Sequence, residues 1–373
     1  MQDAYDVAVI GAGIVGLGQA LAAARRGHRV IVLDRDAQAN GASVRNFGFI
    51  TVTGQSAGKT WERARRSRDI WAEVAPRAGI PIEHTGLVVL ARRPEAATVL
   101  DAFASHAMGE DCELLDARVA RQRFPNLSPQ SLSAALWSPH ELRVESRHAI
   151  GQLAAWLEDE MGVVFRRQTA VCAVEPPFIE TTTGPVFADA AVVCPGDDFV
   201  SLFPERLAPF GLLRCQLQML RVVPPFQGWR LPGGLMSDLS LVRYPGYAAL
   251  PEARALQARL EREQPEHLAQ GIHLIAVQGS DGSLIIGDSH HNAATPPPFA
   301  NAQVDALIID ECEAALGHRL GPVIERWTGT YAKADDREAL IDSPGRRVRL
   351  VVVTSGTGAS TAFALGEEVM ASL

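Results

Sequence analysis

A glycine-rich segment near the N-terminus has the spacing of a dinucleotide-binding turn. Its residues are Gly11, Ala12, Gly13, Ile14, Val15 and Gly16. In such a turn the first glycine permits a tight bend, the second lets the backbone approach a pyrophosphate, and the third permits close packing of helix on strand. About 20 residues further on, Asp34 stands where a carboxylate accepts hydrogen bonds from a ribose diol, with Arg35 beside it. The pattern predicts a bound dinucleotide and disfavours NADP, because Asp34 would repel a 2′-phosphate. The alternative is a glycine turn in an ordinary βαβ unit.

The residues on either side of this segment predict the elements that position it. Residues 7–10 are a short apolar run that ends in glycine, as is typical of a fully buried parallel strand. Residues 17–24 then carry apolar side chains at helical spacing, and Gly27 is placed to end that helix. A second apolar run follows at residues 30–33. The order predicts a βαβ unit with Asp34 in register with the glycine turn.

Three further segments favour FAD over NAD. Residues 41–48 supply small residues and backbone amides, and residues 192–196 end a buried strand in a glycine. Residues 354–360 form a second glycine-rich turn between a strand and a helix, which a long cofactor with an isoalloxazine ring needs and a simple NAD dehydrogenase does not. The candidate cofactor-binding residues in these segments are Ser43, Arg45, Asn46, Phe47, Gly48, Cys194, Gly196, Gly356, Thr357, Gly358, Ala359 and Ser360.

The middle of the chain has a different pattern from its two ends. Residues 217–223 and 274–286 indicate strands of a more antiparallel sheet, with a turn at residues 279–283. We predict an α/β fold in which a Rossmann-type FAD-binding domain carries an inserted α+β substrate domain with a mostly antiparallel sheet. The FAD-binding domain is assigned to residues 1–83, 145–205 and 325–373, and the substrate domain to residues 84–144 and 206–324.

Composition narrows the classes of function. The chain has 373 residues, which is enough for two lobes. Its formal net charge of -8 would repel the phosphate backbone of a nucleic acid, so no nucleic-acid partner is predicted. The five cysteines are scattered without the spacing of a metal or redox motif, which favours a reducing compartment and a cytoplasmic location. The apolar run at residues 7–24 lacks a basic leader and is broken by glycines, so neither an export signal nor a transmembrane segment is predicted.

The whole pattern resembles the D-amino-acid oxidase superfamily, which includes glycine oxidase, sarcosine oxidase and D-amino-acid dehydrogenases. The tract at residues 325–329, the pair Asp335 and Asp336, and residues 354–358 are similar to the closing flavin-binding region of that family. Residues 43–48, 287–291 and 355–361 are similar to a bacterial branch associated with phosphonate breakdown.

The resemblance also implies roles for individual residues. Val171 takes the position of the family's backbone contact to the adenine, and Arg45, Asn46 and Gly48 take the approach to the isoalloxazine. Sarcosine-oxidase members attach flavin through a late cysteine, but no cysteine follows Cys312 here. Non-covalent FAD is therefore predicted. The helix near Ala359 would aim its positive end at the pyrimidine side of the ring.

The superfamily reaction is hydride transfer from the carbon that bears a neutral amine to the flavin, followed by hydrolysis of the imine. It needs no dedicated nucleophile, and no Ser/His/Asp or Cys/His signature is present, so no catalytic residue is assigned. The reaction needs an anion clamp and a close, dry fit. We expect oxygen or another electron acceptor, and a small amine as the substrate.

Arg243 and Tyr244 are the first candidates for the clamp, because they follow a strand-like run at residues 239–242. A guanidinium offers a planar fork to a carboxylate or phosphonate, and a phenol adds a donor. His290 and His291 are candidates for a proton acceptor or second anion contact, without the spacing of a metal site. Each choice has a plain structural alternative, namely a solvated arginine beside a core tyrosine, and loop histidines bonded to local backbone.

Two residues of the closing tract, Tyr331 and Lys333, are predicted to face either the flavin or water. Two functions remain open from the sequence. One is an enzyme that acts on a small amino acid or an aminophosphonate such as 2-aminoethylphosphonate or its N-methyl form. The other is a non-catalytic FAD-binding subunit of a larger complex. The oligomeric state, the exact substrate and the choice between oxidase and dehydrogenase are not fixed by the sequence.

Overall fold

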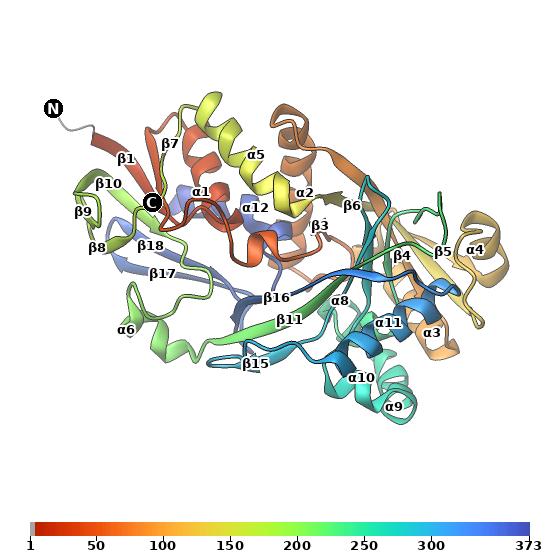
Figure 1. Ribbon diagram of the computed structural model, residues 1–373. Helices are drawn as coiled ribbons and strands as arrows, with labels where there is room; N and C mark the ends of the chain where they lie inside the picture. The colour runs from red at the N-terminus through yellow and green to blue at the C-terminus, as the bar shows by residue number, and fades with distance from the viewer. Residues whose placement is uncertain (1–3) are drawn as a thin grey trace.

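A computed structural model describes residues 4–373 of the chain (Figure 1). Its first sheet has eight strands, and the central five run parallel. In spatial order the main strands are β17 (Ala339–Gly345), β18 (Val348–Val353), β10 (Val186–Val193), β1 (Ala4–Ile10), β2 (Val30–Leu33) and β7 (Val164–Arg166). β17 is antiparallel to β18, and the short antiparallel strands β8 (Val171–Glu175) and β9 (Phe178–Thr181) extend from β10.

The central strands of this sheet are buried on both faces, which explains their continuous apolar runs. Val7 and Val9 point into one core, whereas Ala8 and Ile10 point into another. The first core is covered by the helices α1 (Ile14–Arg25), α2 (Lys59–Arg77), α5 (Ser146–Asp159) and α12 (Gly358–Ser372), which lie together over the sheet in Figure 1.

The second sheet has ten strands and is mostly antiparallel. Its main order is β15 (His291–Ala293), β11 (Leu213–Val222), β14 (Leu284–Gly287), β13 (Ile275–Gln278), β12 (Gly234–Met236), β4 (Ile82–Ala91), β6 (Ala134–Val144) and β3 (Phe49–Ile50). β16 (Val323–Lys333) pairs with β11, and β5 (Glu113–Asp116) pairs with β6. β12 and β4 form a parallel pair.

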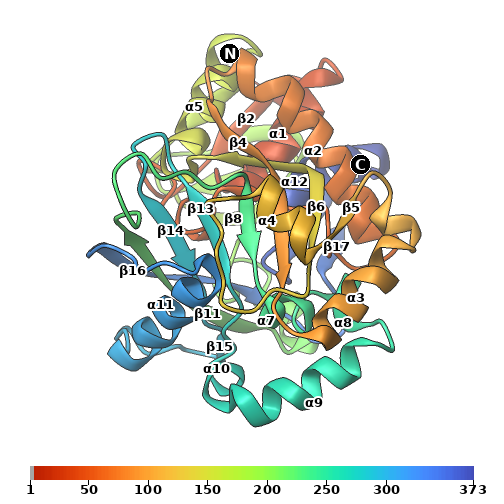
Figure 2. The ribbon, with the colours of Figure 1, turned by 90° about the vertical axis from the view of Figure 1, so that its right-hand side faces the viewer.

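Among the remaining helices, α9 and α10 lie at the lower edge of Figure 2, and α11 lies above them on the left. The bounds are α3 (Pro94–Ala104), α4 (Ala117–Arg123), α6 (Pro204–Leu207), α7 (Asp238–Leu241), α8 (Pro245–Ala248), α9 (Ala253–Glu263), α10 (Pro265–Ala269) and α11 (Ala302–Leu316), with 3-10 turns at η1 (Ala42–Val44), η2 (Ala107–Gly109) and η3 (Ala208–Phe210).

Glycines bring α1 and α12 into close contact. A Cβ added at Gly18 would lie 2.6 Å from the carbonyl oxygen of Ala362, and one added at Gly366 would lie 2.3 Å from that of Gly18. Larger side chains would therefore force the two helices apart. This packing holds the first and last helices of the chain side by side.

The predicted fold class is confirmed, with a Rossmann-type sheet and a mostly antiparallel second sheet. The strand expected at residues 239–242 is wrong, because residues 238–241 form the short buried helix α7. The domain boundaries stay a prediction. β16 spans the boundary at residue 325, and it pairs with the second sheet. Among residues 4–373, no helix is both long and apolar enough to cross a bilayer.

Candidate active site

A cavity of about 1090 Å³ is lined by residues of both sheets. The predicted cofactor residues that line it are Gly11, Gly13, Ile14, Val15, Gly16, Asp34, Arg35, Ser43, Arg45, Asn46, Phe47, Val171, Cys194, Gly196, Gly356, Thr357, Gly358, Ala359 and Ser360. The predicted substrate residues that line it are Arg243, Tyr244, His290 and Tyr331. Ala12, Gly48 and His291 are not part of the lining. The cavity thus joins the two groups of residues, although their roles stay predictions.

The glycine turn after β1 has the backbone geometry that its sequence predicts. Gly11 has a φ of +103°, and a Cβ there would lie 2.5 Å from the carbonyl oxygen of Cys194. A Cβ at Gly16 would lie 1.9 Å from the carbonyl oxygen of Gly11. Gly13 precedes α1 and provides no side chain to cap it. The N-terminus of α1 therefore opens on the cavity and suits a phosphate group.

Asp34 has a second role in this turn. Its Oδ2 accepts a hydrogen bond from the backbone N–H of Ala12 at 2.6 Å, and its Oδ1 accepts one from Asp36 at 2.9 Å. Each carboxylate oxygen has a further lone pair, which leaves capacity for ribose hydroxyls. Ala12 thus acts through its backbone on Asp34. The neighbouring Arg35 forms an ion pair with Asp198 at 2.7 Å.

The segment at residues 41–48 holds its own shape through side chains. Asn46 donates from Nδ2 to the carbonyl of Ala42 at 2.7 Å, and its Oδ1 accepts from the N–H of Gly48 at 2.7 Å. Gly48 has a φ of +66°, and a Cβ there would lie 1.8 Å from the carbonyl oxygen of Val144. Gly48 therefore shapes the loop from outside the cavity lining. The Oγ of Ser43 accepts from the N–H of Ile14 at 2.9 Å, which ties the loop to α1.

A second helix N-terminus opens on the same cavity. α12 begins at Gly358 after Thr357, whose side chain makes no capping hydrogen bond. Gly356 has a φ of +75°, so the chain turns sharply between β18 and α12. The Oγ of Ser360 accepts from the N–H of Thr51 at 2.9 Å. Two positive helix ends and two glycine turns fit a long cofactor with a pyrophosphate and an electron-accepting ring.

On the second-sheet side, Arg243 and Tyr244 lie between α7 and α8 rather than at the end of a strand. The backbone N–H groups of both residues donate to the carbonyl of Ser240, in the last turn of α7. Within the described part of the chain, Arg243 has no carboxylate within 4.0 Å. Its guanidinium is therefore available to an acidic ligand.

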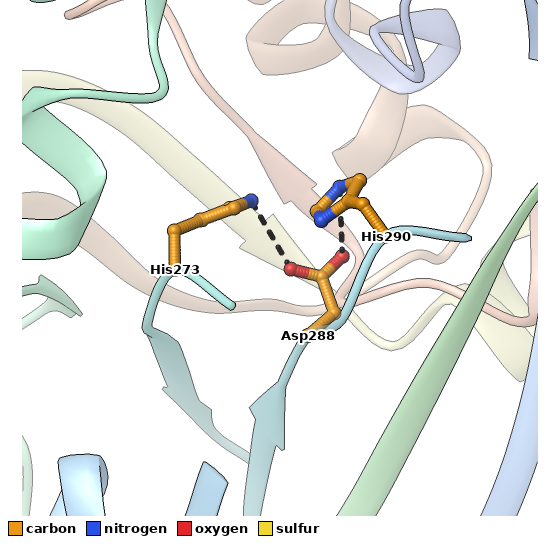
Figure 3. A group of neighbouring side chains, drawn as sticks. All are labelled: His273, Asp288 and His290. Carbon is orange, nitrogen blue, oxygen red and sulfur yellow. Dashed lines mark ion pairs between the residues drawn. The ribbon is translucent and has the colours of Figure 1, made fainter. Parts of the chain in front are cut away.

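Next to Arg243, three polar side chains form a cluster that sequence reasoning missed in part (Figure 3). Nε2 of His273 lies 3.1 Å from Oδ1 of Asp288, and Nε2 of His290 lies 3.8 Å from Oδ2. Burial raises the pKa of Asp288 to about 7, although Arg243 opposes this. Burial and then Arg243 lower the pKa of His290 to about 3, and burial lowers that of His273 well below its usual value. Both imidazoles are therefore neutral near pH 7.

The other predicted substrate residues have different positions. His291 starts β15, lies outside the cavity lining, and has its Nε2 2.9 Å from Oε1 of Gln270. Its role in substrate binding stays a prediction. Tyr331 lies on β16 opposite Cys215, and its ring faces that of His290 at 6.5 Å between centroids. Lys333 also lines the cavity and donates from Nζ to the carbonyl of Ala334 at 2.6 Å.

His273 and Asp288 are the main lining residues without a prediction. Asp288 stands in the tract at residues 287–291, in which the two histidines, His290 and His291, are the residues predicted to bind substrate. His273 has no sequence signal beyond its place just before an apolar run. The cluster contains three atoms of metal-ligand type that all lie within 4.8 Å of one another, so the prediction of no metal site stays a prediction.

The fold and the cavity together fit one class, the dinucleotide-dependent oxidoreductases with a second, mostly antiparallel sheet. The family model described as FAD dependent oxidoreductase matches residues 6–372, and the chain belongs to this family. FAD is accordingly its cofactor. Its non-covalent attachment stays a prediction based on the absence of a cysteine after Cys312.

Relatives of known structure support the fold. The chain is 26% identical to a glycine oxidase of Geobacillus kaustophilus (strain HTA426) over 210 residues, which are 52% of this chain and 55% of that protein. The chain thus spans about half the length of the curated relative that it matches. The glycine oxidase structure from Bacillus cereus ATCC 14579 has a TM-score of 0.75 at 19% identity, covering 98% of this chain and 93% of that one. L-proline dehydrogenase from P. horikoshii has a TM-score of 0.77 at 18% identity, covering 99% and 93%.

Proposed function

We propose that this protein oxidises a small amine that carries an acid group, by oxidative deamination or N-dealkylation. The observation that carries the proposal is Arg243, a guanidinium with no carboxylate within 4.0 Å in the described chain, on the cavity that the cofactor glycines also line. Such a group binds a carboxylate or phosphonate through two parallel N–H bonds. Tyr244, beside it on the cavity, adds a hydroxyl donor.

When bound, FAD accepts a hydride from the carbon next to the nitrogen. The residues of this chain orient the substrate for that transfer. Arg243 fixes the acid group, while the rings of Tyr244 and Tyr331 limit the positions open to the rest of the molecule. The N-terminus of α12 would favour negative charge on the nearby part of the cofactor. Neither the orientation of the substrate nor the hydride transfer needs a nucleophilic side chain.

For the substrate itself, we propose an aminophosphonate, 2-aminoethylphosphonate or its N-methyl form. The support is the resemblance of residues 43–48, 287–291 and 355–361 to a phosphonate-associated branch. It also includes the positive charge of Arg243 on the cavity, joined by Lys333, whose Nζ lies 3.4 Å from Oδ1 of Asp335. A phosphonate carries more negative charge than a carboxylate and so gains more from these charges. A glycine or sarcosine type of substrate is the alternative, favoured by the similarity to glycine oxidases.

The test is an anaerobic titration of the yellow protein with glycine, sarcosine, 2-aminoethylphosphonate and its N-methyl derivative. We expect the flavin absorbance to bleach with the aminophosphonates first. Peroxide release and dye reduction, measured in parallel in air, then separate an oxidase from a dehydrogenase. Bleaching by the amino acids alone would reject the phosphonate. No bleaching by any amine would favour a non-catalytic FAD-binding subunit.

A further inference from the structure

The cavity holds two opposite charges that do not neutralise each other. Arg243 and Asp288 both line it, yet they are more than 4.0 Å apart and form no ion pair. Arg243 is nevertheless close enough to Asp288 for its guanidinium to lower the pKa of that carboxyl. Asp288 is buried, whereas Arg243 is exposed on the cavity. A buried charge in a protein is normally paired, and an exposed guanidinium without a carboxylate partner is free to bind an anion. The arrangement therefore suits a ligand that brings a positive end to Asp288 and a negative end to Arg243.

Asp288 is 96% buried, with 4% of its surface exposed, and a hydrogen bond from its own backbone N–H lowers the pKa of its carboxyl. Its Oδ1 is shut off from solvent and accepts no hydrogen bond, even though Nε2 of His273 is 3.1 Å away. Its Oδ2 lies 3.8 Å from His290, beyond hydrogen-bonding distance. Several charged or titratable groups interact with the cluster electrostatically. They are Arg243, Tyr244, Cys215 and Tyr331, with His291 and Lys333 also acting on His290.

The tautomer of His290 leaves a second acceptor atom next to Asp288. Its Nδ1 is 2.9 Å from the carbonyl oxygen of Gly271, so Nδ1 carries the proton of the neutral ring. Nε2 then presents a lone pair to Oδ2 of Asp288, and the two atoms face each other as acceptors across 3.8 Å. A group with several N–H bonds would satisfy both atoms at once. A substrate ammonium is such a group.

We infer that Asp288, with His290 beside it, is the amine subsite of this protein and binds the nitrogen of the substrate while Arg243 binds its acid group. The inference rests on the proposed function and adds a residue to it. Asp288 also accepts one proton of the ammonium: the N–H bond breaks, an O–H bond forms at Oδ2, and the electron pair stays on nitrogen. The free amine that results is the form from which a bound FAD would accept a hydride.

A divalent cation is the other species that would satisfy two lone pairs, since His273, Asp288 and His290 offer three ligand atoms. The charges on the cavity favour the ammonium. Arg243 and Lys333 both make the site more positive, as their effect on the pKa of His290 shows. An acidic substrate bound to Arg243 brings its own counter-charge next to its ammonium, whereas a free cation does not.

The experiment compares wild type with Asp288→Asn on two kinds of ligand. One is the best amine from the panel above, and the other is its analogue without nitrogen, ethylphosphonate for 2-aminoethylphosphonate or acetate for glycine. Binding of the analogue is measured from the perturbation of the flavin spectrum. Asp281→Asn is the matched control, because Asp281 lies in the turn of the same hairpin, bonds Ser283, and is outside the cavity lining.

We expect kcat/KM for the amine at pH 8 to fall about 10- to 100-fold in Asp288→Asn, the range for a hydrogen bond to a charged group. The analogue should bind at least as tightly as to wild type, because a negative charge near its acid group is gone. In wild type, kcat/KM should rise with pH through about 7 as Asp288 ionises, and this rise should vanish in the variant. Asp281→Asn should match wild type.

An equal loss for both ligands, or unchanged amine kinetics, would overturn the inference. So would activity that disappears after chelation and returns with Zn²⁺, because the cluster would then be a metal site. If wild type oxidises no amine at all, the proposed function fails instead. If wild type is active and the variant matches it, the amine subsite alone fails.

Discussion

On the first-sheet side of the cavity, called here the backbone-lined side, the lining includes the glycine turns after β1 and β18 and the N-terminal turns of α1 and α12, which bring backbone groups to the cavity. On the second-sheet side, it is mainly side chains, Arg243, Tyr244, Asp288, His290 and Tyr331, from segments far apart in the chain. We predict that the first kind of surface binds the pyrophosphate and the ribose of FAD. The second depends on individual side chains, so single substitutions there can alter the substrate without affecting the cofactor.

The difference predicts two separable sets of variants. Substitutions on the backbone-lined side should reduce flavin content and stability together, because the same turns build the sheet. Substitutions on the side-chain-lined side should leave flavin content intact. The four predictions below test this separation.

The largest effect is expected for Gly11→Ala. The new Cβ would lie 2.5 Å from the carbonyl oxygen of Cys194, and the residue would have to keep a φ of +103°. Strain and overpacking together should cost about 3 kcal/mol of the free energy of unfolding and most of the bound flavin. Thermal unfolding and the flavin-to-protein absorbance ratio measure both losses.

Its control is Gly151→Ala in α5, where nothing lies within 4 Å of an added Cβ and no positive φ is required. That variant should be neutral or more stable by about 0.5–1 kcal/mol. Full flavin content in Gly11→Ala would show that this turn does not hold the cofactor.

Arg243→Lys tests the side-chain-lined half. The charge is kept but the planar fork is lost, so substrate binding should weaken by about 1.5–3 kcal/mol. Flavin content should stay equal to wild type. Steady-state kinetics on the amine panel measure the change, with Arg254→Lys on the exposed face of α9 as the control. Unchanged kinetics on the best substrate would remove Arg243 from the acid-group clamp.

Asp34→Ala should weaken FAD binding by about 1–3 kcal/mol. The ribose would lose its acceptor, and the N–H groups of Ala12 and Asp36 would lose theirs. Titration of apoprotein with FAD measures the affinity. Asp159→Ala, an exposed carboxylate at the end of α5, serves as the comparison. Equal affinities in the two variants would contradict the assignment of Asp34 to the ribose.

The two halves of the cavity also differ in how far the sequence predicts them. Gly11, Gly16 and Asp34 follow from local spacing, because one turn and one strand end fix their positions. Residues 239–242 were expected to form a strand, yet a short apolar run does not distinguish a strand from a buried helix, and α7 is a helix. The position of Arg243 on the cavity therefore depends on a helix end that periodicity does not reveal.

The cluster of His273, Asp288 and His290 shows why the remaining contacts are not predictable from the sequence. The hairpin of β13 and β14 pairs Ile275 with Gly287, and continuing that register would place His273 opposite Ser289. Instead His273 and Asp288 exchange backbone hydrogen bonds at 3.4 and 3.1 Å. A slip of one residue reverses which side chains share a face of a sheet. Local sequence contains no signal for that slip, so the contact between His273 and Asp288 emerges only in three dimensions.

The smallest expected effect is on the stability of Asp288→Asn without ligand, and its sign opposes the effect on activity. The pKa of Asp288 is raised from 3.8 to about 7 in the folded protein, so the folded state favours the neutral acid. The stabilising contribution of protonation is therefore fully present below pH 3.8 and is lost as pH rises through about 7. An amide carries no charge to bury. The free energy of unfolding of the variant should therefore be about 1–2 kcal/mol higher than that of wild type at pH 8. The difference should shrink towards pH 4, where both side chains are neutral.

Thermal unfolding of both proteins at several pH values measures this difference in stability. Addition of an amine substrate should reduce the difference at pH 8, because the substrate stabilises wild type more than the variant. A variant less stable than wild type at pH 8 would mean that the Asp288 carboxylate already has a stabilising partner in the folded protein without substrate.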